Sequence, residues 1–557
     1  MAHSFFGYKN IFHGSDVMIF IPHEDDEINI AGAAIYGLIQ EGFHVTCVFA
    51  TNGDRSYLAE TRIQEAAEAL KMLGVPYEDI IILGYPDGDM DAGRSPYARG
   101  LNQAITVDGH TRTYGIAGKV DFSMAESGEH TPYTRKGFLG DVENLIRRYH
   151  PSNIIAIDID SHPDHRACSI AFETAMGHIL NEEGNTYFPV VLKAFAYNTG
   201  FESVVDFNSL HLCSTRFNRN RLADSSFETD NPVYHWEERV RLPVPEPCRK
   251  PVLSQNLIYR ALRCHLSQRA FLKANQIINS DQVYWLRRTD NLAFCGITTA
   301  SSGNAEAVHD FKMVDVENIA DKRLVFDTCL WEPSSIDKER SITIHFYKPQ
   351  HISVVKLYGN VNKESRILAG RLVFSNGYSV ETGPLECNGQ ASNIPIESQS
   401  SIKWLTFQIL KAEGPHPGIT EWEIFDQPCP DMHICKILVN GEFAYRWDMY
   451  PGETAEVGLY TYPEDIPVVW KLNGVEMRLD DINQKIASGI QAATIQAVNA
   501  KTKDILDEVR LRRAAAFGKI KIKYWRFPCN RLRIWIDKQK IARKHHQLRV
   551  LKRNSLG

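Results

Sequence analysis

The sequence has 557 residues, of which 43% are apolar and 23% are charged, and its 62 Lys and Arg residues nearly balance 68 Asp and Glu residues to give a net charge of −6. This composition excludes a mainly disordered chain, a collagen-like fibre and a protein built only from coiled coil. At roughly 150 residues per domain, the length predicts three or four domains.

The net charge conceals two regions of opposite sign. Residues 509–557 contain 16 Lys and Arg residues and a single acid, Asp537, which gives a local charge of +15. The other 508 residues carry 46 Lys and Arg against 67 Asp and Glu, a charge of −21. The sequence therefore joins a basic C-terminal segment to an acidic body.

Cysteine usage and hydropathy predict where the chain works. Eleven cysteines lie between Cys47 and Cys529 without a CxxC pair or a regular spacing, which favours reduced thiols over a disulfide framework. The first twenty residues are not built like a signal peptide, and no 18 apolar residues run together. We therefore expect a cytoplasmic protein. Because of its basic segment, the protein could also bind peripherally to the inner face of the membrane.

The first 300 residues alternate short apolar runs with helical patterns. The runs predict buried strands at 17–21, 43–50, 80–83, 153–157 and 190–196. Helical patterns cover about 28–40 and 57–73, and apolar residues within 142–149 fall on one face of a predicted helix. The composition of 87–132 is typical of a long loop. Strand–helix repetition of this kind predicts an α/β domain with a Rossmann-like parallel sheet.

After residue 301 the pattern changes to short β-rich segments. Strands are expected at 341–346, 353–358, 371–374 and 404–409, which predicts an all-β jelly-roll sandwich. A small β-sandwich at 434–474 and a helical stretch at about 475–509 precede the basic segment. Four domains are predicted. They are the α/β domain at 1–300, the β-sandwich at 304–428, the small β domain at 430–474, and the helix with its basic amphipathic tail at 475–557.

Two short motifs follow strands that neighbour each other in the usual Rossmann order. Residues 22–27, Pro-His-Glu-Asp-Asp-Glu, come directly after the first strand, and residues 161–165, Ser-His-Pro-Asp-His, come shortly after the fourth. Two histidines and one carboxylate from separate loops would make a three-ligand site with an open position, as a hydrolytic zinc requires. Taken singly, the first motif could be an acidic helix N-terminus and the second a turn fixed by proline.

These motifs resemble those of the PIG-L/LmbE-like N-acetylglucosaminyl deacetylase family, whose hallmarks are a His-Pro-Asp-Asp-Glu turn and a later His-Pro-Asp-His segment. Glu24 stands here where the family has proline, at a position that is not a ligand. Family-like segments also occur at 51–54, 62–66, 83–88, 265–268 and 285–290. The resemblance covers about residues 17–292.

The resemblance implies a zinc-dependent hydrolase that removes the acetyl group from an N-acetylglucosamine-type sugar. The basic C-terminal segment favours a sugar that is linked to a lipid, a nucleotide or a polymer, because assembly of the cell envelope at the membrane would explain that segment. The resemblance also implies that a divalent metal, most simply Zn²⁺, binds His23, Asp26 and His165. Asp25 would be the general base that takes a proton from the activated water. The further implied residues are His162 for the oxyanion or the leaving amine, Asp164 to orient or charge His162, and Arg62 and Asp87 for substrate binding, with a salt bridge and a turn cap as their structural alternatives.

The two β-rich regions also carry family resemblances. Residues 304–426 resemble a discoidin (F5/8 type C), galactose-binding-like module, on segments 357–359, 370–377 and 417–423. Such a module would either hold a glycan or act as a spacer. Residues 434–474 resemble a small immunoglobulin-like domain in which Trp470 is a core residue.

Three interpretations of the basic segment remain open. Cations alternating with aromatic and aliphatic residues suit an anionic membrane surface. Nucleic acid is a rival partner for a +15 segment, and packing against the acidic body is the structural alternative. For the whole chain, the competing function is a non-catalytic glycan-binding protein of cell-envelope polysaccharide assembly.

Overall fold

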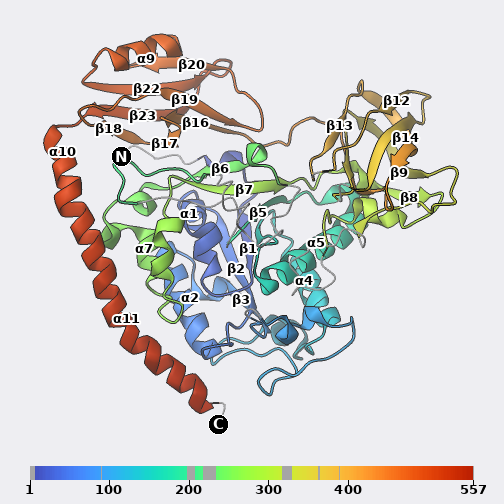
Figure 1. Cartoon of the computed structure of the whole chain (residues 1–557), viewed down its shortest axis with the longest axis horizontal. Helices are drawn as coiled ribbons and strands as arrows, with labels where there is room; N and C mark the ends of the chain where they lie inside the picture. Colours follow the sequence, from blue (N-terminus) through green and yellow to red (C-terminus); the bar gives the residue numbers. More distant parts are fainter. Residues whose placement is uncertain are drawn as a thin grey trace.

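The structure is a computed structural model, and it describes residues 7–88, 91–196, 207–216, 234–315, 329–361, 364–387 and 389–555. An α/β domain occupies the centre, one β module lies beside it, and a second β module lies above it (Figure 1). From this second module a long C-terminal helix, red in Figure 1, runs down the side of the α/β domain.

The α/β domain is built on a seven-stranded sheet of order β3-β2-β1-β4-β5-β7-β6. Its five parallel strands are β1 (Asp16–Ile21), β2 (His44–Thr51), β3 (Ile80–Tyr85), β4 (Asn153–Ile157) and β5 (Val190–Ala194). Two antiparallel strands, β7 (Asp281–Arg287) and β6 (Val240–Pro243), complete the edge. The predicted parallel sheet is confirmed, and so is the adjacency of the first and fourth strands.

Helices cover both faces of this sheet. α1 (Asp26–Gln40), α2 (Ala59–Leu73) and α7 (Leu257–Leu262) lie on one side, and α4 (Arg135–Tyr149) and α5 (Pro163–Glu183) lie on the other (Figure 1). The five parallel strands are mostly apolar because both of their faces are buried, as the apolar runs predict. Within the described part of 87–132, the helices are short pieces such as α3 (Phe122–Ser127).

The first β module is a two-sheet sandwich. One sheet has the order β13-β10-β15 and the other β12-β11-β14-β9-β8, and Trp331, Trp422 and Phe407 are buried in the core between them. The strands are β8 (Gly296–Ala300), β9 (Ser341–Ile352), β10 (Val354–Gly359), β11 (Arg366–Phe374), β12 (Ser379–Thr382), β13 (Ser392–Ile394), β14 (Gln399–Glu413) and β15 (Ile419–Phe425). The predicted all-β sandwich is confirmed.

The second β module extends farther along the chain than the sequence suggested. Its sheets have the orders β17-β16-β19 and β18-β23-β22-β20-β21, and Trp470 lies in its core as expected. The strands are β16 (Ile434–Val439), β17 (Glu442–Phe443), β18 (Arg446–Met449), β19 (Val457–Tyr462), β20 (Val468–Leu472), β21 (Val475–Glu476), β22 (Ala492–Asn499) and β23 (Ile505–Arg513).

The expected helix over 475–509 is therefore wrong. Only α9 (Leu479–Ala487) is helical in that stretch, and the following residues form β22 and β23, which pair with each other. Along β22, Ala493, Ile495 and Ala497 are buried while Ala492, Thr494 and Gln496 are more exposed, which is the period-two pattern of a strand. The first basic residues of the C-terminal segment, up to Arg513, belong to this sheet and not to a tail.

The remaining basic segment is helical, with α10 (Ala516–Lys521), a π-helical turn (Ile522–Arg526) and α11 (Phe527–Ser555). α11 packs on the α/β domain through buried side chains. Asp537 accepts a hydrogen bond from Tyr259 Oη at 2.9 Å and pairs with Arg263 Nε at 3.0 Å, and Ile541 joins the domain's hydrophobic core. Of the open alternatives for the segment, packing against the body is thus confirmed for α11.

A close contact between α5 and the segment that follows β8 in the first β module gives a testable prediction. A Cβ atom at Gly177 would overlap the carbonyl of Asp310, whereas one at Gly140, inside α4, would meet nothing within 4 Å. We expect Gly177→Ala to lower the free energy of unfolding by about 1–3 kcal/mol through overpacking. The matched Gly140→Ala should raise it by up to about 1 kcal/mol. Urea unfolding followed by circular dichroism measures both, and equal effects would contradict the contact.

Candidate metal centre

The two predicted motifs meet at one edge of the sheet. Residues 22–25 connect β1 to α1, which begins at Asp26, and residues 158–162 connect β4 to α5, whose first turn contains Asp164 and His165. Because β1 and β4 are parallel neighbours, their carboxyl ends bring both loops together. The loop after β3 adds Asp87 beside them, so the predicted His23, Asp26, His165, His162, Asp164 and Asp87 form one cluster.

Asp26 lies at the centre of the predicted ligand triad. Its Oδ2 atom is 3.3 Å from His23 Nδ1 and 3.2 Å from His165 Nε2. Zinc bonds of about 2.0–2.2 Å in a tetrahedral site separate neighbouring donor atoms by about 3.3–3.6 Å. The three side chains are buried, and the two distances from Asp26 suit a metal of this kind.

Two carboxylates fix the orientation of the histidine rings. Asp160 Oδ2 lies 2.8 Å from His165 Nδ1, and Asp164 Oδ2 lies 3.0 Å from His23 Nε2. A carboxylate only accepts hydrogen bonds, so each of these ring nitrogens carries the hydrogen. The opposite nitrogen of each ring faces Asp26, and it would become a metal ligand on losing its proton to the solvent.

Negative charge exceeds positive charge in this buried cluster. Burial lowers the pKa of His165, but the carboxylates of Asp160 and Asp26 outweigh it and raise that pKa to about 9. For His23 the carboxylates likewise outweigh burial and raise the pKa well above its usual range. Four carboxylates surround the two rings, each at most 6% exposed: Asp26, Asp87, Asp160 and Asp164. A divalent cation would neutralise this excess.

Other subsets of the cluster could also hold a metal. One donor atom each from His23, His162 and His165 lie within 4.8 Å of one another, and the same holds for His23, Asp87 and Asp164. All three candidate sets share His23, so the position of a metal is restricted to the same small space.

His162 stands at the start of α5 as its N-cap. Its Nδ1 accepts the backbone N–H of Asp164 at 3.2 Å, so the ring hydrogen of the neutral form is on Nε2. Burial, and next the cationic rings of His23 and His165, lower the pKa of His162 to about 4. The Asp164 carboxylate contacts His23 and also accepts the Gly88 N–H at 2.9 Å.

Asp25 is held between two cations. Arg62 Nη2 is 3.5 Å from its Oδ1, and Lys273 Nζ is 3.5 Å from its Oδ2. Arg62 also donates to the Glu24 carbonyl at 2.8 Å, so this predicted substrate-binding residue is itself buried in the framework of the site. Burial raises the pKa of Glu24 to about 8 although Arg62 opposes the shift.

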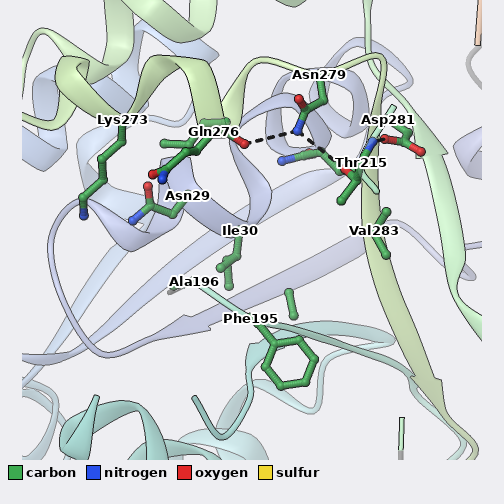
Figure 2. Close-up of a pocket in the computed structure, with 13 residues that line it drawn as sticks. Asn29, Ile30, Phe195, Ala196, Thr215, Lys273, Gln276, Asn279, Asp281 and Val283 are labelled. Carbon is green, nitrogen blue, oxygen red and sulfur yellow. Dashed lines mark hydrogen bonds between the residues drawn. The ribbon is translucent and has the colours of Figure 1, made fainter. Parts of the chain in front are cut away.

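Two pockets adjoin Asp25. Lys273 lines the first, in which Asn29 and Gln276 lie beside it and Phe195 and Ala196 lie across the space (Figure 2). Arg62 and Asp87 line the second, together with residues of the loop 267–269 and of α11. Both pockets contain residues far apart in the sequence.

The residues of this cluster lie in a region of the chain that matches a known protein family. The family model described as "PIG-L: GlcNAc-PI de-N-acetylase" matches residues 18–176, which include all eight predicted site residues. Residues 18–176 form a PIG-L family domain. A second model, "Domain of unknown function (DUF7402)", matches residues 291–425. The discoidin and immunoglobulin resemblances, and a glycan at the β-sandwich, stay predictions.

Solved structures with similarity include N,N'-diacetylchitobiose deacetylase from Pyrococcus horikoshii, at 20% identity over 36% of this chain and 66% of that chain, with a TM-score of 0.23. A deacetylase of the teicoplanin biosynthesis pathway is 16% identical over 50% of this chain and 99% of that one, with a TM-score of 0.30. A conserved protein from Thermus thermophilus is 22% identical over 34% of this chain and 70% of that one, with a TM-score of 0.23. The chain thus spans just under two thirds of the first of these proteins. Among proteins with curated functions, no match is found.

Several residues that build the PIG-L site carry little signal in the sequence. The spacing of Asp160 from His162 does not indicate what Asp160 does, although Asp160 follows a buried strand, where functional residues of such sheets gather. Lys273 lies in a short helical segment remote from both motifs. Glu65 on α2 accepts the N–H and hydroxyl of Ser267 and so holds the loop that lines the second pocket.

The Asp160–His165 contact yields a direct prediction. Asp160→Asn replaces an acceptor-only group that fixes the His165 tautomer, so we expect the affinity for Zn²⁺ to fall by about 10- to 100-fold. Competition with a chromogenic chelator measures this affinity. Asp431→Asn, an exposed residue, is the control, and an unchanged affinity in Asp160→Asn would contradict the assigned role.

Proposed function

We propose that this protein is a metal-dependent amidohydrolase that removes the acetyl group from an N-acetylated amino sugar. The observation that carries the proposal is the buried Asp26 carboxylate facing two imidazoles whose other nitrogens are bound by Asp160 and Asp164. The PIG-L match over the same residues supports it. The sugar is proposed to be of the N-acetylglucosamine type, linked to a lipid, a nucleotide or a polymer.

His23, Asp26 and His165 would hold the metal, most simply Zn²⁺. This set is preferred to the two others because both ring nitrogens that are not bound by Asp160 or Asp164 face the same Asp26 oxygen. When bound, such an ion polarises an amide carbonyl and makes water a better nucleophile near neutral pH.

Asp25 is proposed as the general base. Arg62 and Lys273 each contact one of its carboxylate oxygens, and this fixes the carboxylate next to the triad. From there it can accept a proton from the attacking water and return it to the departing nitrogen. Acetate and a free amino sugar are the products.

His162 is proposed to stabilise the developing oxyanion. Its Nε2–H is set by the hydrogen bond that Nδ1 accepts from the Asp164 backbone. A neutral donor held in this way stabilises negative charge on the carbonyl oxygen without first taking a proton from water. Arg62 and Asp87, which line the second pocket, would contact the sugar.

The role of Asp25 is tested by Asp25→Asn. The amide keeps the shape of the carboxylate but cannot accept the proton, so we expect acetate release from N-acetylglucosamine conjugates to fall by about 10²- to 10⁴-fold. Metal content should stay at the wild-type value because Asp25 is not in the proposed ligand triad. Asp91→Asn, an exposed matched change, should be fully active.

Three results separate the possibilities. Full acetate release by Asp25→Asn would overturn the base assignment. Loss of bound metal together with activity would assign Asp25 to the ligands. Glycan binding by the native protein with neither bound metal nor acetate release would support the non-catalytic alternative.

A membrane surface is proposed as a partner of the C-terminal helical segment. Among the described helices, none combines the length and the apolar character that a membrane crossing requires. Instead, the π-helical turn and the first part of α11 expose Tyr524, Trp525, Leu532 and Trp535, with exposed fractions between 48% and 69%. Basic residues on the same segment would add about 1 kcal/mol each near an anionic surface.

Vesicle sedimentation tests this surface. We expect binding to phosphatidylglycerol vesicles at low salt, little binding at high salt or to phosphatidylcholine, and weaker binding by Trp535→Ser. Tyr347→Ser, which removes an aromatic ring that is 65% exposed on β9, is the matched control. No binding to anionic vesicles at low salt would contradict the proposal.

A further inference from the structure

The second pocket joins the catalytic cluster to the C-terminal helix. Arg62 and Asp87 line this pocket, and they contact Asp25 and His23 at 3.5 Å each. The same pocket is lined by Arg55 after β2, by Arg269 in the loop after α7, and by His545 and Arg549 of α11. His545 is 488 residues from Tyr57 in the sequence, and both line this pocket, so the C-terminal helix supplies part of the wall beside the site.

Contacts on both sides of the pocket hold α11 in this position. Asn530 receives the Leu253 N–H on its Oδ1 at 3.0 Å and donates to the Pro251 carbonyl at 3.0 Å. Beyond the pocket, Lys552 Nζ lies 3.6 Å from Asp108 Oδ2. With Asp537 and Ile541 buried between them, these contacts place the pocket-facing residues of α11 before any ligand binds.

Tyr57 orders the two pocket residues of α11. Arg549 Nε donates to the Tyr57 hydroxyl oxygen at 3.3 Å, and that hydroxyl lies 2.7 Å from His545 Nε2. The tyrosine hydrogen can therefore be donated to Nε2, which leaves the His545 ring hydrogen on Nδ1. An arginine and a histidine are thus fixed by one hydroxyl group.

Positive charge dominates the pocket lining. Across the described residues, no carboxylate pairs with Arg55, Arg269 or Arg549, and Asp87 is the one acidic side chain that lines the pocket. Burial, and next the charges of Arg269 and Arg549, lower the pKa of His545. Cations that converge on one cavity repel each other until an anion enters.

We propose that Arg55, Arg269, His545 and Arg549 form a subsite for a phosphate group carried by the N-acetylated sugar, with α11 as its wall. Guanidinium groups present paired N–H donors that match the oxygens of a phosphate, and several of them around one cavity suit its charge. The subsite deepens the proposed function and rests on it, because the sugar amide would reach Asp25 while the phosphate is held beside α11. The C-terminal helix is then a specificity element of the enzyme as well as a surface.

Calorimetric titration of the metal-loaded full chain tests the subsite. The probes are N-acetylglucosamine 1-phosphate, N-acetylglucosamine and the carboxylated N-acetylmuramic acid, and the Asp25→Asn background prevents turnover. We expect the phosphorylated sugar to bind about 10- to 100-fold more tightly than the neutral one. Arg549→Gln should reduce this preference about tenfold, and rising salt should reduce it further in both proteins.

Two variants make the test specific. Arg269→Gln removes a cation from a different element, so a reduced preference in this variant supports the subsite even if Arg549→Gln displaces α11. Arg531→Gln removes the same charge from an exposed position of α11 and should keep the full preference. An equal loss in Arg531→Gln, or no preference for the phosphorylated sugar, would overturn the subsite. Preferred binding of the carboxylated sugar would overturn the phosphate assignment.

The outcome is independent of catalysis. A phosphate preference that depends on Arg549 and Arg269 would support the subsite even if the wild-type protein releases no acetate, a result that would overturn the proposed function alone. Acetate release from neutral and phosphorylated sugars at equal kcat/KM would retain the proposed function and overturn the subsite.

Discussion

One carboxylate oxygen holds the site together. Asp26 Oδ2 lies within 3.3 Å of a nitrogen from each of two histidines, and the opposite nitrogens of those rings are bound by Asp160 and Asp164. The result is a continuous chain of carboxylate, imidazole, carboxylate, imidazole and carboxylate in a buried space. Such an arrangement has more acceptors than hydrogens and more negative than positive charge, so a cation at its centre stabilises it.

The arrangement of the strands and helices brings the residues of this site together. Parallel pairing of β1 with β4 places the first turns of α1 and α5, which carry Asp26 and His165, at one sheet edge. The antiparallel strands β6 and β7 widen the sheet on the side where Lys273 reaches Asp25. The α11 helix lines the second pocket through His545 and Arg549. The basic segment, which the net charge conceals, is therefore part of the site's surroundings.

The sequence predicted the parts of the site that local pattern encodes. Apolar runs located the five parallel strands, and the two motifs located His23, Asp26 and His165, because strand ends and motif spacing are local properties. Asp160 could not be assigned a role from sequence, since its partner is defined by the rotation of a ring. Lys273, His545 and Arg549 reach the site only through tertiary packing. The helix expected over 475–509 is wrong at 492–499 because these residues pair with β20 and β23, and strand pairing is not a local property of the sequence.

Metal dependence is the central claim, and stepwise metal restoration tests it most directly. The full chain is stripped with a chelator, Zn²⁺ is added back in known amounts, and acetate release from N-acetylglucosamine conjugates is followed at each step. The account predicts that activity is lost on stripping and returns in proportion to bound metal up to one ion per chain. Acetate release that survives complete removal of the metal would contradict it.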